Sequence, residues 1–330
     1  MPQDNERKPT DTTPANRLGI DYRDVPARKT TGPIIDAHTH IKDAESAKLF
    51  FEAADTYGIG DVVSMTPLKN VNVLREIYAD RLRFIAIPNW EKQDATEAFR
   101  ASWIDDLTTF RERGARVCKF WVAPYLRGKY GLTLTHEFLR PVVEHALELG
   151  YDFMIHVADP TLWWAAGGKY EDTAKFGTKS EQYEQLEWLL ARAAPRFVIG
   201  AHMAGNVEDP GFLAGLLERH ANLYLDSSAT KWMVREVSNK PAAVRDLIVA
   251  FPDRILFGSD LVSDPKYDTF DHYASRYWAQ LRLWETACDG ESPIEDPDAA
   301  DPPRLVGIDL PEDVLRKMYF ENARRLYYES

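Results

Sequence analysis

The alternation of short apolar runs with longer helical segments constrains the fold of this chain most strongly. Most of the runs are rich in β-branched or aromatic residues and apolar on both faces, as strands of a buried parallel sheet are. The eight runs are Pro33–His38, Asp61–Met65, Leu82–Ile87, Ala115–Trp121, Asp152–Val157, Arg196–His202, Asn222–Asp226 and Arg254–Asp260. Between them, apolar residues recur every three or four positions. Eight strand–helix units predict an α/β fold, a (β/α)8 TIM barrel.

An open doubly wound sheet is the competing architecture. We disfavour it because no Gly-x-Gly-x-x-Gly turn follows the first run. We expect a single barrel domain over residues 31–330. Residues 1–30 are polar and form an extension that is disordered or wraps the surface, where Leu18, Ile20 and Tyr22 could anchor it. The acidic, proline-containing stretch 289–309 is expected to be a solvated excursion.

Composition limits the partners and the compartment. The net charge of −12 argues against nucleic acid or an anionic membrane as the main partner, because both favour a positive protein surface. Two cysteines make no disulfide framework, which favours a reducing compartment. No apolar run approaches the roughly 20 residues of a membrane span, and the N-terminus carries no apolar signal segment. We expect a cytoplasmic protein with a small-molecule substrate, and a homo-oligomer is compatible with the sequence.

The motif Asp36-Ala37-His38-Thr39-His40 ends the first apolar run. Side chains alternate along a strand, so Asp36, His38 and His40 are expected on one face, with Asp36 one step deeper. Two neighbouring imidazoles at the end of a buried strand suit a divalent metal. Two histidines that merely fall two apart in a turn are an equal alternative until further ligands are found.

Further polar residues lie at the other predicted strand ends. Catalytic residues of such barrels occupy the C-terminal ends of the strands. There the sequence places Lys119 on strand four, His156 on strand five, His202 on strand six and Asp260 on strand eight. Each alone has an ordinary structural explanation, such as a core histidine or a capping aspartate. As a set with His38 and His40, they favour a functional site.

The order of these residues resembles the amidohydrolase superfamily of metal-dependent barrels. The segment Gly258-Ser259-Asp260 and the tail Glu321-Asn322-Ala323-Arg324-Arg325-Leu326 are similar to its amidohydrolase-2 branch. That branch also holds decarboxylases related to aminocarboxymuconate-semialdehyde decarboxylase. The resemblance covers roughly residues 33 to 327, and its motifs are specific for fold and metal site but poor for substrate.

The resemblance implies that His38, His40, His156 and Asp260 bind one divalent metal. Three nitrogens and one carboxylate leave a position open for water, as a catalytic metal requires. Zinc is the first expectation, although manganese, iron or cobalt suit such ligands. Asp260 would also act catalytically, by taking the proton of the metal-activated water. His202 would hydrogen-bond that water or stabilise negative charge on the substrate.

Lys119 has two interpretations as a catalytic residue. In some members of the superfamily a strand-four lysine is carboxylated and bridges two metals, with the strand-six histidine, here His202, on the second. Lys119 could equally be a free ammonium that binds a substrate carboxylate or carbonyl, or be ion-paired in the barrel mouth. The amidohydrolase-2 branch resembles one-metal enzymes, which favours one metal here.

Aromatic residues near the strand ends suggest a substrate-binding wall. Trp90, Trp121, Trp163 and Trp164 are the candidates for contact with a flat or cyclic substrate. Packing of loops against the barrel explains them equally well.

Three functions follow from these residues and the resemblance. The first is a metal-dependent hydrolase, in which metal-activated water attacks an amide, ester or lactone carbonyl. The second is a metal-dependent decarboxylase, a lyase acting on an aromatic or enol carboxylic acid. The third is a barrel that has lost activity and serves as a binding protein, and the complete ligand set argues against it.

Overall fold

A continuous sheet of parallel strands forms the centre of the computed structural model, which describes residues 12–329. The strands are β1 (Ile34–Ile41), β2 (Ile59–Ser64), β3 (Leu82–Ala86), β4 (Val117–Trp121), β5 (Asp152–His156), β6 (Val198–Gly200), β7 (Leu223–Asp226), β8 (Ile255–Leu256) and β9 (Leu261–Ser263). Neighbours in the sheet follow the chain from β1 to β8, and β9 pairs with β1. Seven of the eight predicted strands therefore appear as single strands in the predicted order.

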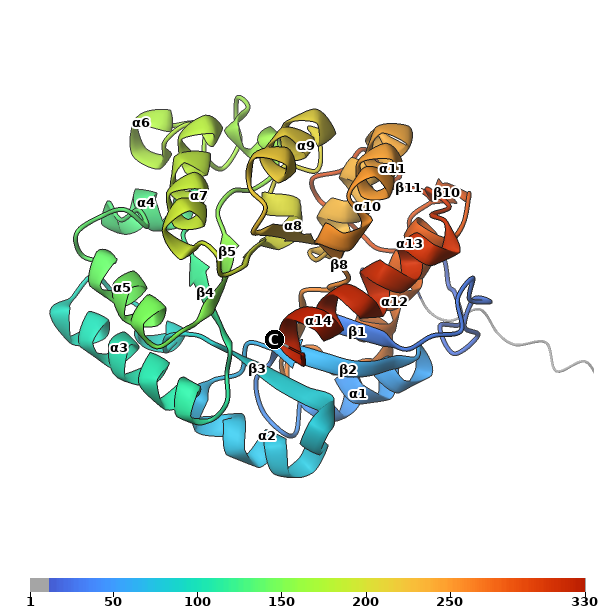
Figure 1. The fold of residues 1–330 in the computed structure, drawn as a ribbon. Helices are drawn as coiled ribbons and strands as arrows, with labels where there is room; N and C mark the ends of the chain where they lie inside the picture. The colour runs from blue at the N-terminus through green and yellow to red at the C-terminus, as the bar shows by residue number, and fades with distance from the viewer. Residues whose placement is uncertain (1–11, 330) are drawn as a thin grey trace, which may run out of the picture.

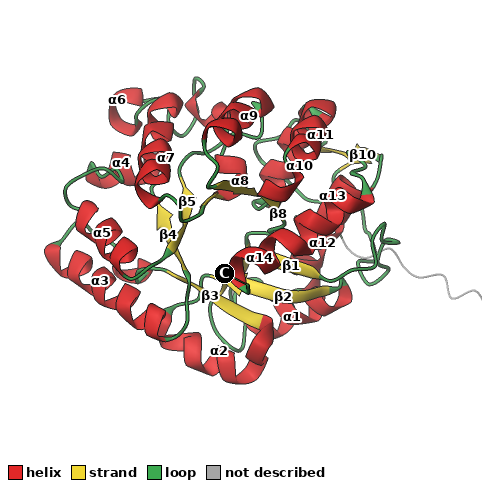
Figure 2. Ribbon diagram, in the orientation of Figure 1, coloured by secondary structure: helices red, strands yellow, loops and turns green. Residues whose placement is uncertain are grey.

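The eighth strand is present in two pieces that close the barrel. β8 pairs with β7, and β9 pairs with β1. Between these pieces the Ala37 N–H donates to the Phe257 carbonyl at 3.0 Å, and the Asp260 N–H donates to the His38 carbonyl at 2.8 Å. The interrupted strand thus joins both edges of the sheet, and the predicted (β/α)8 barrel is confirmed (Figure 2).

Helices form a ring around the strands (Figure 1). The helices are α1 (Ala47–Thr56), α2 (Val71–Tyr78), α3 (Glu97–Glu112), α4 (Pro124–Tyr130), α5 (Arg140–Glu148), α6 (Thr173–Phe176), α7 (Lys179–Ala193), α8 (Ala201–Ala204), α9 (Pro210–Arg219), α10 (Thr230–Asn239), α11 (Pro241–Ala250), α12 (Phe270–Glu285), α13 (Glu312–Arg316) and α14 (Asn322–Tyr327). Shorter turns are the 3₁₀ segments Leu68–Asn70, Ala79–Arg81, Trp90–Lys92, Thr161–Trp164 and Pro252–Arg254, and the π-helix Lys317–Glu321.

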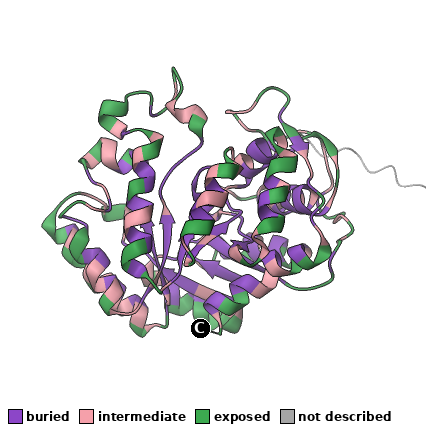
Figure 3. Cartoon of the chain, turned by 45° about the horizontal axis from the view of Figure 1, so that its top comes forward, coloured by how far each residue is buried: buried purple, intermediate pink, exposed green. Residues whose placement is uncertain are grey.

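The core lies between the strands and the inner faces of the helices (Figure 3). In α3 the predicted spacing is realised, since Phe99, Trp103, Leu107 and Phe110 are all buried. These side chains recur at three or four residues and therefore form one stripe against the sheet. Residues on both faces of the strands are buried, which explains why the strand sequences are nearly continuous apolar runs.

A bulge in β1 contradicts the prediction that Asp36 shares a face with the two histidines. Between Asp36 and Thr39 the strand uses one residue more than its partner β2. Asp36 therefore faces the helical layer, where its carboxylate accepts hydrogen bonds from Ser259 Oγ at 2.6 Å and from the Tyr277 hydroxyl of α12 at 2.9 Å. The extra residue reverses the alternation, so that His38 and His40 face the barrel mouth instead.

The predicted strand Arg196–His202 ends two residues early, at Gly200. The chain then turns sharply, and His202, Met203 and Ala204 take positive φ values of 58°, 52° and 51°. Such backbone is costly for residues with a Cβ and is kept only where the surroundings enforce it. The turn directs His202 into the mouth of the barrel, which a continued strand would not do.

The segments outside the barrel are more closely attached than the sequence predicts. Of the expected anchors, Tyr22 is buried and Ile20 packs on the core, whereas Leu18 is exposed. Residues 1–11 of the predicted extension lie outside the described residues. The stretch 289–309 is not simply solvated, because it forms a hairpin of β10 (Asp289–Glu291) and β11 (Arg304–Val306) with buried apolar side chains.

No helix within residues 12–329 has the length and apolar character needed to cross a lipid bilayer.

Candidate metal centre

Two histidines and one carboxylate meet at the end of β1. Asp260 Oδ1 lies 3.1 Å from His40 Nε2 and 3.3 Å from His38 Nε2. One ligand atom from each of these three residues lies within 4.8 Å of the other two. Asp260 reaches this position from the break between β8 and β9, where its own φ is +58°. The structure therefore brings together three of the four residues predicted as metal ligands.

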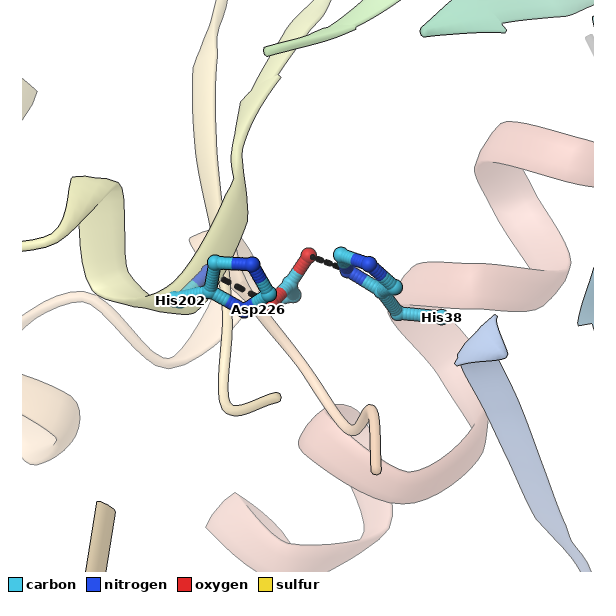
Figure 4. Close-up of side chains that lie close together, drawn as sticks. All are labelled: His38, His202 and Asp226. Carbon is cyan, nitrogen blue, oxygen red and sulfur yellow. Dashed lines mark hydrogen bonds and ion pairs between the residues drawn. The ribbon is translucent and has the colours of Figure 1, made fainter. Parts of the chain in front are cut away.

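Asp226, at the end of β7, lies between His38 and His202 and contacts both (Figure 4). Its Oδ2 accepts a hydrogen bond from His38 Nδ1 at 2.8 Å, and its Oδ1 accepts one from the His202 backbone N–H at 2.9 Å. Both side chains of the Asp226–His38 pair are fully buried. With its Nδ1 proton engaged in this way, His38 presents Nε2 to Asp260, as a metal-binding imidazole held by a carboxylate does.

The charges at this point favour a cation. Burial and the Lys119 ammonium would lower the pKa of His38, but Asp226 and Asp260 raise it above its ordinary value. Burial would raise the pKa of Asp260, yet His202 and the hydrogen bonds from His38 and His40 hold it well below its usual range. The Asp260 carboxylate is thus ionised at neutral pH, and positive charge is stabilised between it and the imidazoles.

His202 stands beside this group as a neutral imidazole. Its ring centroid lies 4.8 Å from that of His38 and 4.8 Å from that of His156. Burial brings the pKa of His202 well below its ordinary value, although the charge of Asp260 opposes this. Its Nδ1 lies 2.7 Å from Ser228 Oγ. Because the Ser228 hydroxyl donates to Asp226 Oδ1, its oxygen accepts from His202 Nδ1 and leaves Nε2 without a proton.

His156, the fourth predicted ligand, lines the same pocket but pairs with a carboxylate of its own. Its Nε2 lies 2.9 Å from Asp159 Oδ1, and the Tyr170 hydroxyl donates to Asp159 Oδ2 at 2.8 Å. Nδ1 is thus the nitrogen of His156 left for a ligand. His156 is absent from the close His38–His40–Asp260 group, and its role as a ligand stays a prediction.

Lys119 is buried in the middle of β4, and its ammonium is directed to the centre. Its Nζ lies 3.4 Å from His38 Nε2. Burial lowers the pKa of Lys119 to about 8, against the opposing charges of Asp226 and Asp260. This contact directs Lys119 toward the interior of the barrel. Both predicted roles, a substrate-binding ammonium or a carboxylated bridge, are compatible with the position.

The central pocket, lined by these residues, has a volume of about 480 Å³. Its aromatic lining consists of Trp90, Trp121, Trp163, Tyr170 and Trp232. The fourth predicted tryptophan, Trp164, does not line it, and its indole N–H donates to the Gly177 carbonyl. A cavity of this size with a few convergent polar groups is typical of small-molecule sites.

The donor set fits a divalent cation. Imidazole nitrogens and a carboxylate oxygen are ligands for zinc and similar metals, and Asp226 and Asp159 provide the outer carboxylates that orient such imidazoles. His38 Nε2 and His40 Nε2 both approach the same ionised oxygen of Asp260. An ion bound between the two histidines would therefore contact this oxygen as well.

Asp226, Ser228, Asp159 and Trp232 belong to the site but were not predicted as site residues. The sequence did contain one signal for Asp226, because it ends the seventh apolar run, where catalytic side chains of such barrels lie. Asp159 and Trp232 follow strand ends by three and six residues, in loops whose paths the sequence does not specify.

We expect Asp226→Asn to weaken metal binding about 10- to 100-fold, the usual effect of losing a carboxylate that orients a ligand histidine. The amide oxygen can still accept from His38 Nδ1, but the negative charge is lost. Competition with a chromophoric chelator measures the change. Asp253→Asn, at an exposed surface ion pair with Lys317, is the matched control. Equal metal affinities in the two variants would contradict the orienting role of Asp226.

Fold and site together define a (β/α)8 barrel with a histidine–aspartate centre at the C-terminal ends of its strands. The chain belongs to the amidohydrolase family, because the family model described as Amidohydrolase matches residues 33–328. This is a family of metal-dependent enzymes that act on small molecules, and the resemblance seen in the sequence is thereby confirmed. A comparison with curated protein sequences finds no significant match.

Solved structures share the fold at low sequence identity. A probable 2-pyrone-4,6-dicarboxylic acid hydrolase from Acinetobacter baumannii, with citric acid bound, is 14% identical, with 90% of this chain and 99% of that chain covered and a TM-score of 0.51. A 2,6-dihydroxybenzoate decarboxylase from Rhizobium is also 14% identical, with the same coverage and a TM-score of 0.54. These similarities show the fold, and both hydrolases and decarboxylases use it.

Proposed function

We propose that the protein is a metal-dependent hydrolase that opens an amide, ester or lactone bond of a small substrate. The observation that carries the proposal is the ionised carboxylate of Asp260, which contacts both His38 and His40 within a pocket of about 480 Å³. An ionised carboxylate at a metal site can bind the ion and accept a proton from water as well.

His38, His40 and Asp260 would hold the metal, with His156 as the fourth ligand through Nδ1. Zinc is our first choice because it accepts this mixture of nitrogen and oxygen ligands. Bound there, the cation would polarise the substrate carbonyl and lower the pKa of water. A single ion suffices for this chemistry, and a second ion would require carboxylated Lys119 together with His202.

The side chains of the site have separate roles in the reaction. Asp260 takes the proton of the attacking water and returns it to the leaving group. His202 Nε2 carries no proton, so it accepts a hydrogen bond from that water and orients it. Lys119, as an ammonium, binds the substrate carbonyl or a carboxylate beside it.

The aromatic lining favours a flat or cyclic substrate. Trp121 lies with its ring centroid 6.2 Å from that of Trp90, and Trp163 lies 5.1 Å from Trp232, both edge to face. These rings form apolar walls on which a planar substrate can pack while its carbonyl faces the polar centre.

Decarboxylation of an aromatic acid is the second candidate, and the same aromatic lining favours it. In that reaction the water or Asp260 would protonate the ring carbon that loses carbon dioxide. The dihydroxybenzoate decarboxylase with this fold shows that such a barrel can serve this chemistry.

A screen of lactones, amides, esters and aromatic acids separates the two reactions. Hydrolysis releases acid or amine without gas, whereas decarboxylation releases carbon dioxide. We expect turnover of at least one lactone or amide without carbon dioxide, and loss of that turnover on chelation without loss of fold. Turnover of aromatic acids alone, with carbon dioxide, would replace the first candidate by the second.

We also propose that the protein is cytoplasmic and that it self-associates. Cys118 and Cys288 are free thiols, which agrees with a reducing compartment.

Mass measurement of the intact chain tests carboxylation of Lys119 independently.

A further inference from the structure

A second, smaller cavity adjoins the central pocket. It has a volume of about 250 Å³, and three of the residues that line it, Trp232, Asp260 and Val262, also line the central pocket. Its outer wall includes three nitrogen-bearing side chains, Lys231, His272 and Arg276. We call it the side cavity. It is large enough for a carboxylate with the carbons that carry it.

The three nitrogen-bearing side chains come from the first two turns of two helices. Lys231 lies in the first turn of α10, and His272 and Arg276 lie one turn apart at the start of α12. Neither helix has a side-chain cap at its N-terminus. Lys231 and His272 therefore lie at helix N-termini, where the helix dipole favours a bound anion.

These cations have no carboxylate partner among residues 12–329. Neither Lys231 nor Arg276 forms an ion pair there, although the chain as a whole carries a net charge of −12. Asp296, an acidic group that acts on Lys231, forms its ion pair with Arg235 instead. The Arg276 guanidinium bonds only within its own helix, to the His272 carbonyl and Ser275 Oγ, each at 3.0 Å. Partly buried arginine is normally paired with an acidic group.

The electrostatics agree with the geometry. Burial lowers the pKa of Arg276 to about 10. Burial and the charge of Arg276 lower the pKa of Lys231, which the more distant Asp296, Glu295 and Asp298 partly offset. Burial, Arg276 and Lys231 also lower the pKa of His272, to about 3. The positive charges of Lys231 and Arg276 repel each other, and an anion between them would offset this repulsion.

We propose that the side cavity is a subsite for a carboxylate substituent of the substrate, bound by Lys231 and Arg276 while the reacting carbonyl lies in the central pocket. The inference rests on the proposed function, because it places the scissile group at His38, His40 and Asp260. The substrate class thereby becomes a small cyclic or aromatic compound with a second, unreacted acidic group. Asp260 also lines the side cavity, and its Oδ1 is directed to His40 and His38, where the bound metal would offset its charge.

Calorimetric titration of the full-length protein, as purified with its metal, tests the subsite. The probes are benzoate, with one carboxylate, and isophthalate and terephthalate, with two. We expect at least one of the two diacids to bind about tenfold or more tightly than benzoate, as a charge-assisted contact allows. Lys231→Met and Arg276→Met should each remove the preference and leave benzoate binding unchanged. Equal affinities for all three acids in the unmodified protein would overturn the proposal.

Lys266→Met is the matched control. Lys266 is an exposed lysine in the same region that does not line the side cavity, so its loss removes one positive charge and should keep the preference for the diacid. If Arg276→Met fails to fold, Lys231→Met alone decides the outcome. A preference that survives in Lys231→Met, or that disappears equally in Lys266→Met, would contradict a built subsite.

Inorganic phosphate separates this proposal from the proposed function. Titrated into chelator-treated protein, phosphate should bind the unmodified chain and Lys266→Met, but about tenfold more weakly or not at all to Lys231→Met. That result supports the subsite even if no hydrolysis is found. Phosphate binding without any diacid preference would instead identify a site for a free anion and overturn the substrate assignment.

Discussion

Replacement of Asp260 by asparagine is expected to lower kcat/KM by at least about 1,000-fold while the fold is retained. The substitution keeps the shape of the side chain but removes the charge that contacts His38 and His40. It removes the proposed metal ligand and the proposed acceptor of the water proton together, and each of these functions alone is worth about 10² or more in rate. Steady-state kinetics on the substrate from the screen, with circular dichroism as a check of folding, measures the effect.

Asp268→Asn provides the control for this variant. Asp268 is exposed in the loop that follows β9, so the same chemical change there should leave kcat/KM within about twofold. Loss of bound metal should accompany loss of activity in Asp260→Asn. A variant at Asp260 that retains full activity would exclude the proposed mechanism.

Gly205→Ala is expected to cost about 3 kcal/mol in the free energy of unfolding and most of the activity. Gly205 has a φ of +68°, and a Cβ at this position would lie 2.0 Å from the Ala158 carbonyl oxygen and 2.9 Å from the Asp159 backbone nitrogen. Backbone atoms cannot yield as a flexible side chain does. The loop that carries Asp159, and with it the orientation of His156, would have to move. Denaturant unfolding measures the loss.

Gly114→Ala separates backbone strain from packing. Gly114 has a similar positive φ of +84°, but a Cβ there would meet no atom within 4 Å. In this variant the free energy of unfolding should fall only by the cost of the left-handed conformation, about 1 kcal/mol, and the activity should be kept. Similar losses of stability in the two variants would show that the contact between Gly205 and the Ala158 loop is not a constraint on the site.

Periodicity explains how much of the fold could be predicted. Strands buried on both faces must be apolar throughout, and helices that cover them must carry an apolar stripe, so the runs 82–87 and 152–157 and the stripe of α3 indicated the barrel directly. The rule that parallel barrels carry chemistry at strand C-termini then led to His38, His40 and Asp260, and the structure places these three together.

The remaining features depend on local departures from regular geometry. The bulge in β1 turns Asp36 toward Tyr277, and alternation along an ideal strand predicts the opposite. His202 and Asp260 adopt a left-handed backbone conformation although neither is a glycine, so the sequence contains no signal for it. The positions of long-range partners such as Asp226 depend on the register of the strands in the barrel. The hairpin 289–306 packs through few apolar residues, and its acidic, proline-containing sequence otherwise indicates a solvated loop.

We propose that one cation binds between side chains that lie more than 200 positions apart in the chain. Anomalous diffraction from crystals of the zinc-loaded protein tests this claim most directly. We predict a single strong peak at about 2.0–2.2 Å from His38 Nε2, His40 Nε2 and an Asp260 oxygen, with His156 as the nearest further nitrogen. No peak between these residues, or a peak at another position only, would contradict the account.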